Sequence, residues 1–150
     1  MLNQSLLDAY NQTNYYFDEI LLNIDRQSTE AKSLLKPFTP KGGLFITAWN
    51  PLGKEVDLID NELANKSLKK DLLSRGLTLI EGYGESLDGM WRENSFFAYP
   101  VDEDMSINLC HMYLQNAVVY VTSDGLPKLI FNINYSAHDK KTKKSVKAKA

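Results

Sequence analysis

Two kinds of hydrophobic spacing occur along the chain, and together they predict a mixture of helices and strands. Apolar residues three or four positions apart are typical of helices, and continuous or alternating apolar runs are typical of strands. Helices are expected over 5–10, 28–35, 57–75 and 102–116. Extended chain or strands are expected over 15–17, 20–24, 44–49, 77–82, 91–99, 117–121 and 128–133, with a loop over 83–89.

Local signals support the helix limits. Ser28 is a suitable N-cap for the second helix, and Gly76 follows the third helix at the C′ position. The apolar stripe of the third helix is Ala64, Leu68 and Leu72, with Asn61 on the same stripe near its N-terminal end.

From position 44 onward the predicted order is strand, helix, strand, strand, helix, strand, strand. The first six elements match a split βαββαβ (ferredoxin-like) core, in which helices pack on one face of a mainly antiparallel sheet. The N-terminal helix and strands would extend that sheet. The alternative is a doubly wound parallel sheet, which is disfavoured because no helix connects the second and third strands of the core.

Composition and charge divide the chain into two parts. Hydrophobic residues make up 43% and charged residues 24%, which is typical of one globular α+β domain and predicts a domain over 1–136. The formal net charge of −2 combines a balance of −7 before position 137 with +5 in the last 14 residues. This lysine-rich tail, 137–150, has no apolar periodicity and is predicted to be disordered.

The sequence shows no signal for secretion, membrane insertion or metal binding. Cys110 is the single cysteine, so no internal disulfide can form. The start of the chain does not resemble a signal peptide, and no apolar run approaches the roughly 20 residues of a membrane span. One cysteine and two histidines are too few for a structural zinc site. We therefore expect a cytoplasmic protein that has no membrane segment and no metal, and the sequence leaves the cofactor unknown.

The first candidate for chemistry is the segment from Thr47 to Pro51, where a predicted strand breaks into a loop. Its Trp49 offers a flat apolar surface and Asn50 offers both hydrogen-bond donors and an acceptor. Alternatively, Asn50 only bonds to local backbone before the proline. Asn61 either bonds to neighbouring backbone or lines a wet pocket, because a buried amide needs partners.

The second candidate is the strand that starts at Trp91. Alternation places Trp91, Glu93 and Ser95 on one face and Arg92, Asn94 and Phe96 on the other. A carboxyl between a tryptophan and a serine could be partly desolvated, which would raise its pKa and suit a general base. Alternatively, Glu93 is a strand-edge residue bonded to backbone or to an arginine.

The third candidate is the end of the last predicted helix, Gln115 and Asn116, with His111 one turn before on the same face. These residues either bind a ligand or form a solvated face, and Cys110 beside them is expected to be core. The lysines of 140–149 offer an electrostatic attachment to nucleic acid, or they only solvate the terminus.

Together these motifs resemble a bacterial family of uncharacterised proteins, domain of unknown function 3293. The resemblance rests on Phe-Ile-Thr-Ala-Trp-Asn-Pro at 45–51, Asn61, Trp-Arg-Glu-Asn-Ser-Phe at 91–96 and Gln-Asn-Ala at 115–117, with weaker matches at 9–10 and 13–15. It covers roughly 10–121. The family carries no assigned activity, so the resemblance implies a set of positions and no reaction.

These positions lead to one site hypothesis with three possible functions. We expect Thr47, Trp49, Asn50, Asn61, Trp91, Glu93, Ser95, Gln115 and Asn116 to converge on one pocket. The favoured function is a module that binds a polar, planar small molecule or a nucleotide-like ligand. The alternatives are an enzyme, either a hydrolase or a group transferase, that uses Glu93 as general base, and a nucleic-acid accessory protein that acts through its tail.

Overall fold

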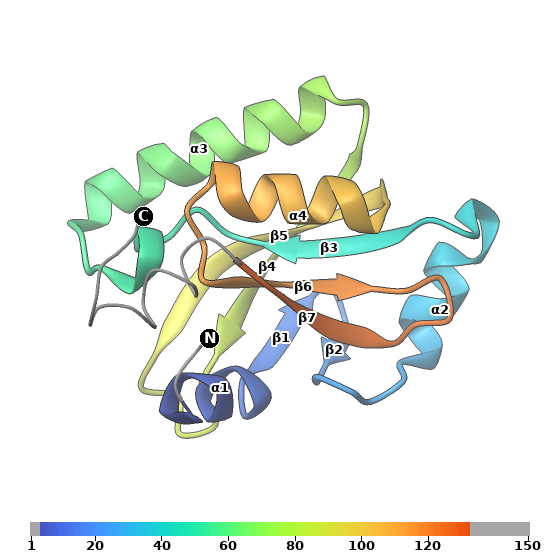
Figure 1. Ribbon diagram of the computed structural model, residues 1–150, viewed down its shortest axis with the longest axis horizontal. Coiled ribbons are helices and arrows are strands. Elements are labelled where there is room, and N and C mark those ends of the chain that lie inside the picture. The colour runs from blue at the N-terminus through green and yellow to red at the C-terminus, as the bar shows by residue number, and fades with distance from the viewer. Residues whose placement is uncertain (1–3, 133–150) are drawn as a thin grey trace, which may run out of the picture.

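A computed structural model describes residues 4–132 as an α+β protein built on one curled antiparallel sheet of seven strands (Figure 1). The helices are α1 (Gln4–Asn11), α2 (Thr29–Leu35), α3 (Leu58–Ser74) and α4 (Glu103–Met112). The strands are β1 (Asn14–Phe17), β2 (Ile20–Leu22), β3 (Gly42–Ile46), β4 (Thr78–Glu85), β5 (Arg92–Val101), β6 (Ala117–Val121) and β7 (Pro127–Phe131). Short 3₁₀ turns occupy Lys36–Phe38 and Pro51–Gly53.

The sheet has the spatial order β2-β1-β4-β5-β3-β6-β7, and every neighbouring pair is antiparallel. The α+β prediction is therefore confirmed, and the doubly wound parallel alternative is wrong for the described residues. The β4–β5 hairpin lies in the middle of the sheet, and the last two strands form a β6–β7 hairpin at one edge.

The two faces of the sheet carry separate hydrophobic cores. On one face α3 and α4 pack side by side, with Leu68, Leu72 and Leu109 fully buried against the sheet (Figure 1). On the opposite face, α2 contributes Ala31 and Leu35 to a second core. The expectation that all helices pack on one face is therefore wrong for α2, because its short apolar stripe covers the side of the sheet that α3 and α4 leave open.

Several element limits follow the prediction. The Ser28 side chain accepts the backbone N–H of Ala31, which confirms it as the N-cap of α2. Gly76 adopts a left-handed backbone (φ 79°) directly after α3, as a C′ residue does. Cys110 is fully buried and confirmed as core.

Other limits differ from the prediction. The loop expected over 83–89 is β4 as far as Glu85, because the strand is paired on both sides, with β1 and with β5. Strand β3 begins at Gly42 and ends at Ile46 rather than covering 44–49. Helix α4 ends at Met112 instead of reaching 116, and Leu114 turns the chain with a positive φ of 53°.

Gly42 and Gly43 begin strand β3, and a steric reason favours glycine at both positions. A Cβ on Gly42 would collide with the carbonyl oxygen of Val121, and one on Gly43 would collide with the ring of Phe97. The absence of a side chain therefore lets β3 approach its neighbours, and the pair does not end the strand.

The last two expectations concern the C-terminal tail and the absence of a membrane segment. The lysine-rich tail and the expected domain end at 136 lie outside the described residues. Within 4–132, no helix is long and apolar enough to cross a membrane.

Candidate functional site

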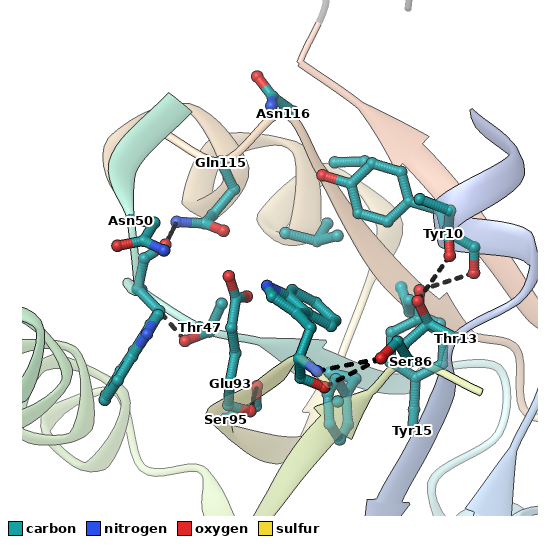
Figure 2. Close-up of a pocket in the computed structure, with 18 of the residues that line it drawn as sticks. Tyr10, Thr13, Tyr15, Thr47, Asn50, Ser86, Glu93, Ser95, Gln115 and Asn116 are labelled. Atoms are coloured by element: carbon teal, nitrogen blue, oxygen red, sulfur yellow. Dashed lines mark hydrogen bonds between the residues drawn. The ribbon is translucent and has the colours of Figure 1, made fainter. Parts of the chain in front are cut away.

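A cavity of about 570 Å³ opens on the sheet face opposite α3 and α4 (Figure 2). Strands β3, β5 and β6 form its floor, and α1, the loop after β3 and the β4–β5 turn form its walls. Eight of the nine sequence-predicted site residues line it: Thr47, Trp49, Asn50, Trp91, Glu93, Ser95, Gln115 and Asn116. The structure therefore brings together residues that are up to 69 positions apart, and only Asn61 is not part of the lining.

The strand register presents Glu93 to the cavity. Alternation along β5 places Trp91, Glu93 and Ser95 on the cavity face, as predicted, and Phe96 in the core under α3 and α4. Glu93 pairs across the sheet with Gly84 of β4. Because glycine has no side chain, the space beside the glutamate stays open.

The carboxyl group of Glu93 has no hydrogen-bond or ion-pair partner among residues 4–132; the prediction of a backbone or arginine partner is wrong. Arg92, the neighbouring cation, lies instead on the opposite side of the strand, 3.6 Å above the ring of Tyr83. Burial raises the pKa of Glu93 to about 7, which confirms the expected desolvation. Figure 2 shows this side chain pointing from β5 in the direction of Gln115.

The loop after β3, which brings Trp49 and Asn50 to the cavity, is held in a strained backbone conformation. Asn50 and Leu52 both have left-handed backbones, with φ of 45° and 54°. Each such residue costs on the order of 1 kcal/mol, so the surroundings must fix it. Asn61 of α3 fixes the conformation of Asn50 through two hydrogen bonds. Its Oδ1 accepts the backbone N–H of Asn50 at 2.8 Å, and its Nδ2 donates to the Asn50 Oδ1 at 3.0 Å.

Asn61 is therefore a positioning residue, and its place in the expected pocket lining is corrected. Both polar atoms of its side chain are bonded to Asn50. This agrees with the interpretation that the buried asparagine bonds to neighbouring backbone rather than lining a wet pocket. The Asn50 side chain also accepts the backbone N–H of Val56 at 3.1 Å, so the loop is closed upon itself.

A second asparagine of α3, Asn65, was not predicted and does the same for the end of β3. Its Oδ1 accepts the backbone N–H of Ala48 at 2.8 Å, and its Nδ2 donates to the Asn94 carbonyl at 2.9 Å. Thr47 donates to that same carbonyl at 2.6 Å. The spacing of Asn61 and Asn65, four residues apart on the buried stripe of one helix, was a signal available in the sequence.

Gln115 and Asn116 reach the cavity from the segment between α4 and β6. The Gln115 Nε2 donates to the backbone carbonyls of Trp49 (3.3 Å) and Tyr113 (3.1 Å), which ties this segment to the loop after β3. Asn116 is 7% exposed, and its Oδ1 has no partner. Because α4 ends at Met112, Gln115 does not share a helix face with His111, which is not part of the lining; that prediction is wrong.

The wall opposite this segment comes from the N-terminus, which the sequence reasoning did not place in the site. Tyr10 of α1 and Tyr15 of β1 line the cavity, and Tyr15 meets the ring of Phe45 edge to face with centroids 5.3 Å apart. The Tyr15 hydroxyl donates to the Tyr10 carbonyl at 3.0 Å, and Thr13 donates to the Ala9 carbonyl at 2.6 Å. The weak N-terminal part of the family resemblance was the available signal.

The serine and threonine hydroxyl groups of the cavity donate to backbone carbonyls or to the Asp88 carboxylate, whose lowered pKa makes it a weak base. Thr47 donates to Asn94, Ser95 to the Glu93 backbone carbonyl at 3.2 Å, and Ser86 to the Asp88 carboxylate at 2.7 Å. Within 4–132, no group of three or more His, Cys, Asp or Glu residues is placed to hold a metal ion. The arrangement in this part of the chain offers recognition by aromatic rings and amides and one carboxyl that titrates near neutrality.

The fold and the cavity define the class: an antiparallel α+β protein with a ligand-sized hollow on the sheet face that α3 and α4 leave uncovered. Residues 46–118 match the family model described as protein of unknown function (DUF3293), and through this segment the chain belongs to that family. The resemblance stated from the motifs is thereby confirmed, although its N-terminal motifs at 9–15 lie outside the matched segment. Comparison with curated proteins and with solved structures gives no match.

Proposed function

We propose that the protein is a binding module whose cavity holds a small planar molecule with a polar edge. One observation carries the proposal: the cavity combines aromatic walls with the half-buried carboxyl of Glu93, which has no partner among residues 4–132. Ligand pockets are concave, largely apolar and supplied with a few polar groups that fix orientation. A volume of about 570 Å³ falls within the usual range of such pockets.

The hydrogen bonds around the cavity support binding because they hold its rim in place before a ligand arrives. Asn61 and Asn65 fix the loop after β3, and Gln115 joins that loop to the segment before β6. Such preorganisation lowers the entropy that binding must overcome. Tyr15 and Phe45, already in edge-to-face contact, offer rings against which a flat molecule can stack.

The experiment is a thermal-shift screen of nucleobases, nucleosides and aromatic metabolites, followed by amide NMR mapping of each hit. A ligand at 100 times its Kd adds about 2.7 kcal/mol of stability, which is about 5–10 °C in Tm for a protein of this size. Gly84→Leu would place a bulky side chain in the cavity beside Glu93 and should abolish the shift. Thr78→Leu, at an exposed position of the same strand, should retain it.

A hit that binds Gly84→Leu as tightly as the native protein would contradict the proposal, because its site would lie elsewhere. A screen without any hit that perturbs the backbone amides of Thr47 or Trp49 would also contradict it.

A second function, an enzyme with Glu93 as general base, is favoured by the pKa of about 7 alone. A base is most effective when its pKa is close to the working pH. No activated nucleophile accompanies it among the described residues, so the base would act on a water or on a substrate proton. Consumption of a bound ligand by the native protein, lost in Glu93→Gln at saturating ligand, would establish the enzyme; a ligand bound and never consumed would reject it.

We also propose that β3, α3, β4, β5, α4 and β6 form a ferredoxin-like unit within the larger sheet. The spatial order β4-β5-β3-β6 supports this, since each helix connects two strands that have one antiparallel strand between them. An experimental structure in which β5 does not lie between β4 and β3 would contradict it.

A further inference from the structure

The electrostatic character of the cavity narrows the chemistry of its ligand. Among its 24 lining residues, all within 4–132, the charged types are Glu93 and Asp88, and no lysine, arginine or histidine is present. The nearest arginine in sequence, Arg92, is engaged with Tyr83 on the other side of β5. None of these described lining residues could therefore neutralise a negatively charged ligand.

The two acidic residues play different parts. Asp88, in the β4–β5 turn, accepts the Ser86 hydroxyl and the Met90 backbone N–H, and these bonds hold its pKa below the usual value. Asp88 is therefore an ionised group at the rim that already accepts hydrogen bonds from Ser86 and Met90. Glu93 lies deeper, on the floor, and the described residues provide it with no donor.

Helix α1, which lines the cavity, adds negative electrostatic potential to that of the two carboxyl groups. Helix α1 ends at Asn11, and its last turn, including Ala9 and Tyr10, lines the wall. The C-terminal end of a helix carries a partial negative charge and favours cations. The floor, the rim and the wall all favour a positive group in this space.

Shape restricts that positive group to a flat one. Five aromatic residues, Tyr10, Tyr15, Phe45, Trp49 and Trp91, are part of the lining of the cavity. The faces of such rings attract cations as well as apolar surface. A planar fork of N–H donors is the partner that a carboxylate binds most strongly.

We infer that the cavity takes a flat ligand that presents a positive charge or paired N–H donors to Glu93, such as an amidinium, a guanidinium or a protonated amino heterocycle. The inference rests on the proposed binding function and makes it specific. It separates nucleobase-like ligands, which fit, from phosphate-bearing nucleotides, which would bring negative charge into a cavity whose described lining holds no cation.

The experiment compares three probes of one size, benzamidine, benzamide and benzoate, by calorimetry and amide NMR with the full chain. At pH 8 benzamidine should bind at least tenfold more tightly than benzamide, and benzoate should bind most weakly. Glu93→Gln should remove the advantage of benzamidine over benzamide. Glu55→Gln, an exposed glutamate outside the cavity, serves as the matched control and should retain it.

The pH profile gives a readout that needs no variant. The other titratable groups that line the cavity with Glu93 are Tyr10 of α1, Tyr15 of β1 and Asp88 of the turn, and burial raises the pKa of Tyr15 above its usual value. If only the ionised Glu93 binds benzamidine, a pKa of about 7 predicts that affinity falls about 30-fold from pH 8 to pH 5.5. Benzamide should change less than threefold.

The results of these measurements separate failure of the inference from failure of the proposed function. Equal affinity of benzamidine and benzoate, or an advantage of benzamidine that survives in Glu93→Gln, overturns the inference while the proposed binding function stands. If none of the three probes perturbs the amides of the cavity, the inference fails, and the screen of nucleobases, nucleosides and aromatic metabolites decides the proposed function separately.

Discussion

The carboxyl group of Glu93 should make the protein less stable as the pH rises from 5 to 8. Burial raises its pKa from 4.5 to about 7 in the folded protein, whereas the unfolded chain keeps the lower value. Between these two values the folded protein holds a proton that the unfolded chain has released. The free energy of unfolding therefore falls as the pH rises through this window, and the full loss of stability is reached above pH 7.

The size of the effect follows from the two pKa values. Each pKa unit corresponds to roughly 1.4 kcal/mol, so the ionised carboxyl costs about 3 kcal/mol at high pH. Glutamine has the same shape and no charge. Glu93→Gln should therefore exceed the native protein in stability, and the difference should widen by roughly 2 kcal/mol from pH 5 to pH 8.

Urea unfolding followed by far-ultraviolet circular dichroism at pH 5, 6, 7 and 8 measures this difference for the two proteins. Glu55→Gln is the matched control, because its side chain is exposed, and its difference from the native protein should stay constant with pH. A difference between Glu93→Gln and the native protein that is independent of pH would refute the assignment of Glu93 as a desolvated carboxyl.

Two structural substitutions give further predictions. Asn61→Ala removes both hydrogen bonds to Asn50 and should lower the free energy of unfolding by about 2 kcal/mol in urea; a loss below about 0.5 kcal/mol would contradict its positioning role. Gly43→Ala places a methyl group against the Phe97 ring and should cost more than about 2 kcal/mol. Gly84→Ala, whose methyl would meet its neighbours at 3.6 Å or more, should cost less than about 1 kcal/mol, and equal losses for the two glycines would contradict the steric explanation.

The orientation of the β5 residues could be predicted from sequence because a strand has a fixed period of two. Once Phe96 is assigned to the core, Glu93 and Ser95 must face the other side. The same reasoning could not show that the other side is a cavity rather than solvent. That depends on α1 and on Tyr15, which come from a distant part of the chain and cover the sheet through tertiary packing.

The end of α4 could not be predicted from the hydrophobic pattern. The apolar stripe continues through Met112 and Tyr113, so periodicity extends the helix toward 116. The helix stops because Leu114 takes a left-handed backbone, and no glycine or proline marks the place. The bonds that stabilise this turn join Gln115 to Trp49 and Leu114 to Leu52, contacts that only the folded chain creates.

The convergence of the motifs on one cavity follows from strand order rather than from any motif alone. Residues 45–51 and 91–96 are about 40 positions apart, yet β3 and β5 are neighbours in the sheet, and Phe45 pairs with Phe97. The antiparallel direction then brings the end of β3 to the start of β5, so that Thr47 bonds to the Asn94 carbonyl. The beginning of β6 lies beside the end of β3 for the same reason. The predicted topology thus already required the three motifs to meet at one edge, and α1, outside the matched segment 46–118, supplies the wall that turns this edge into a cavity.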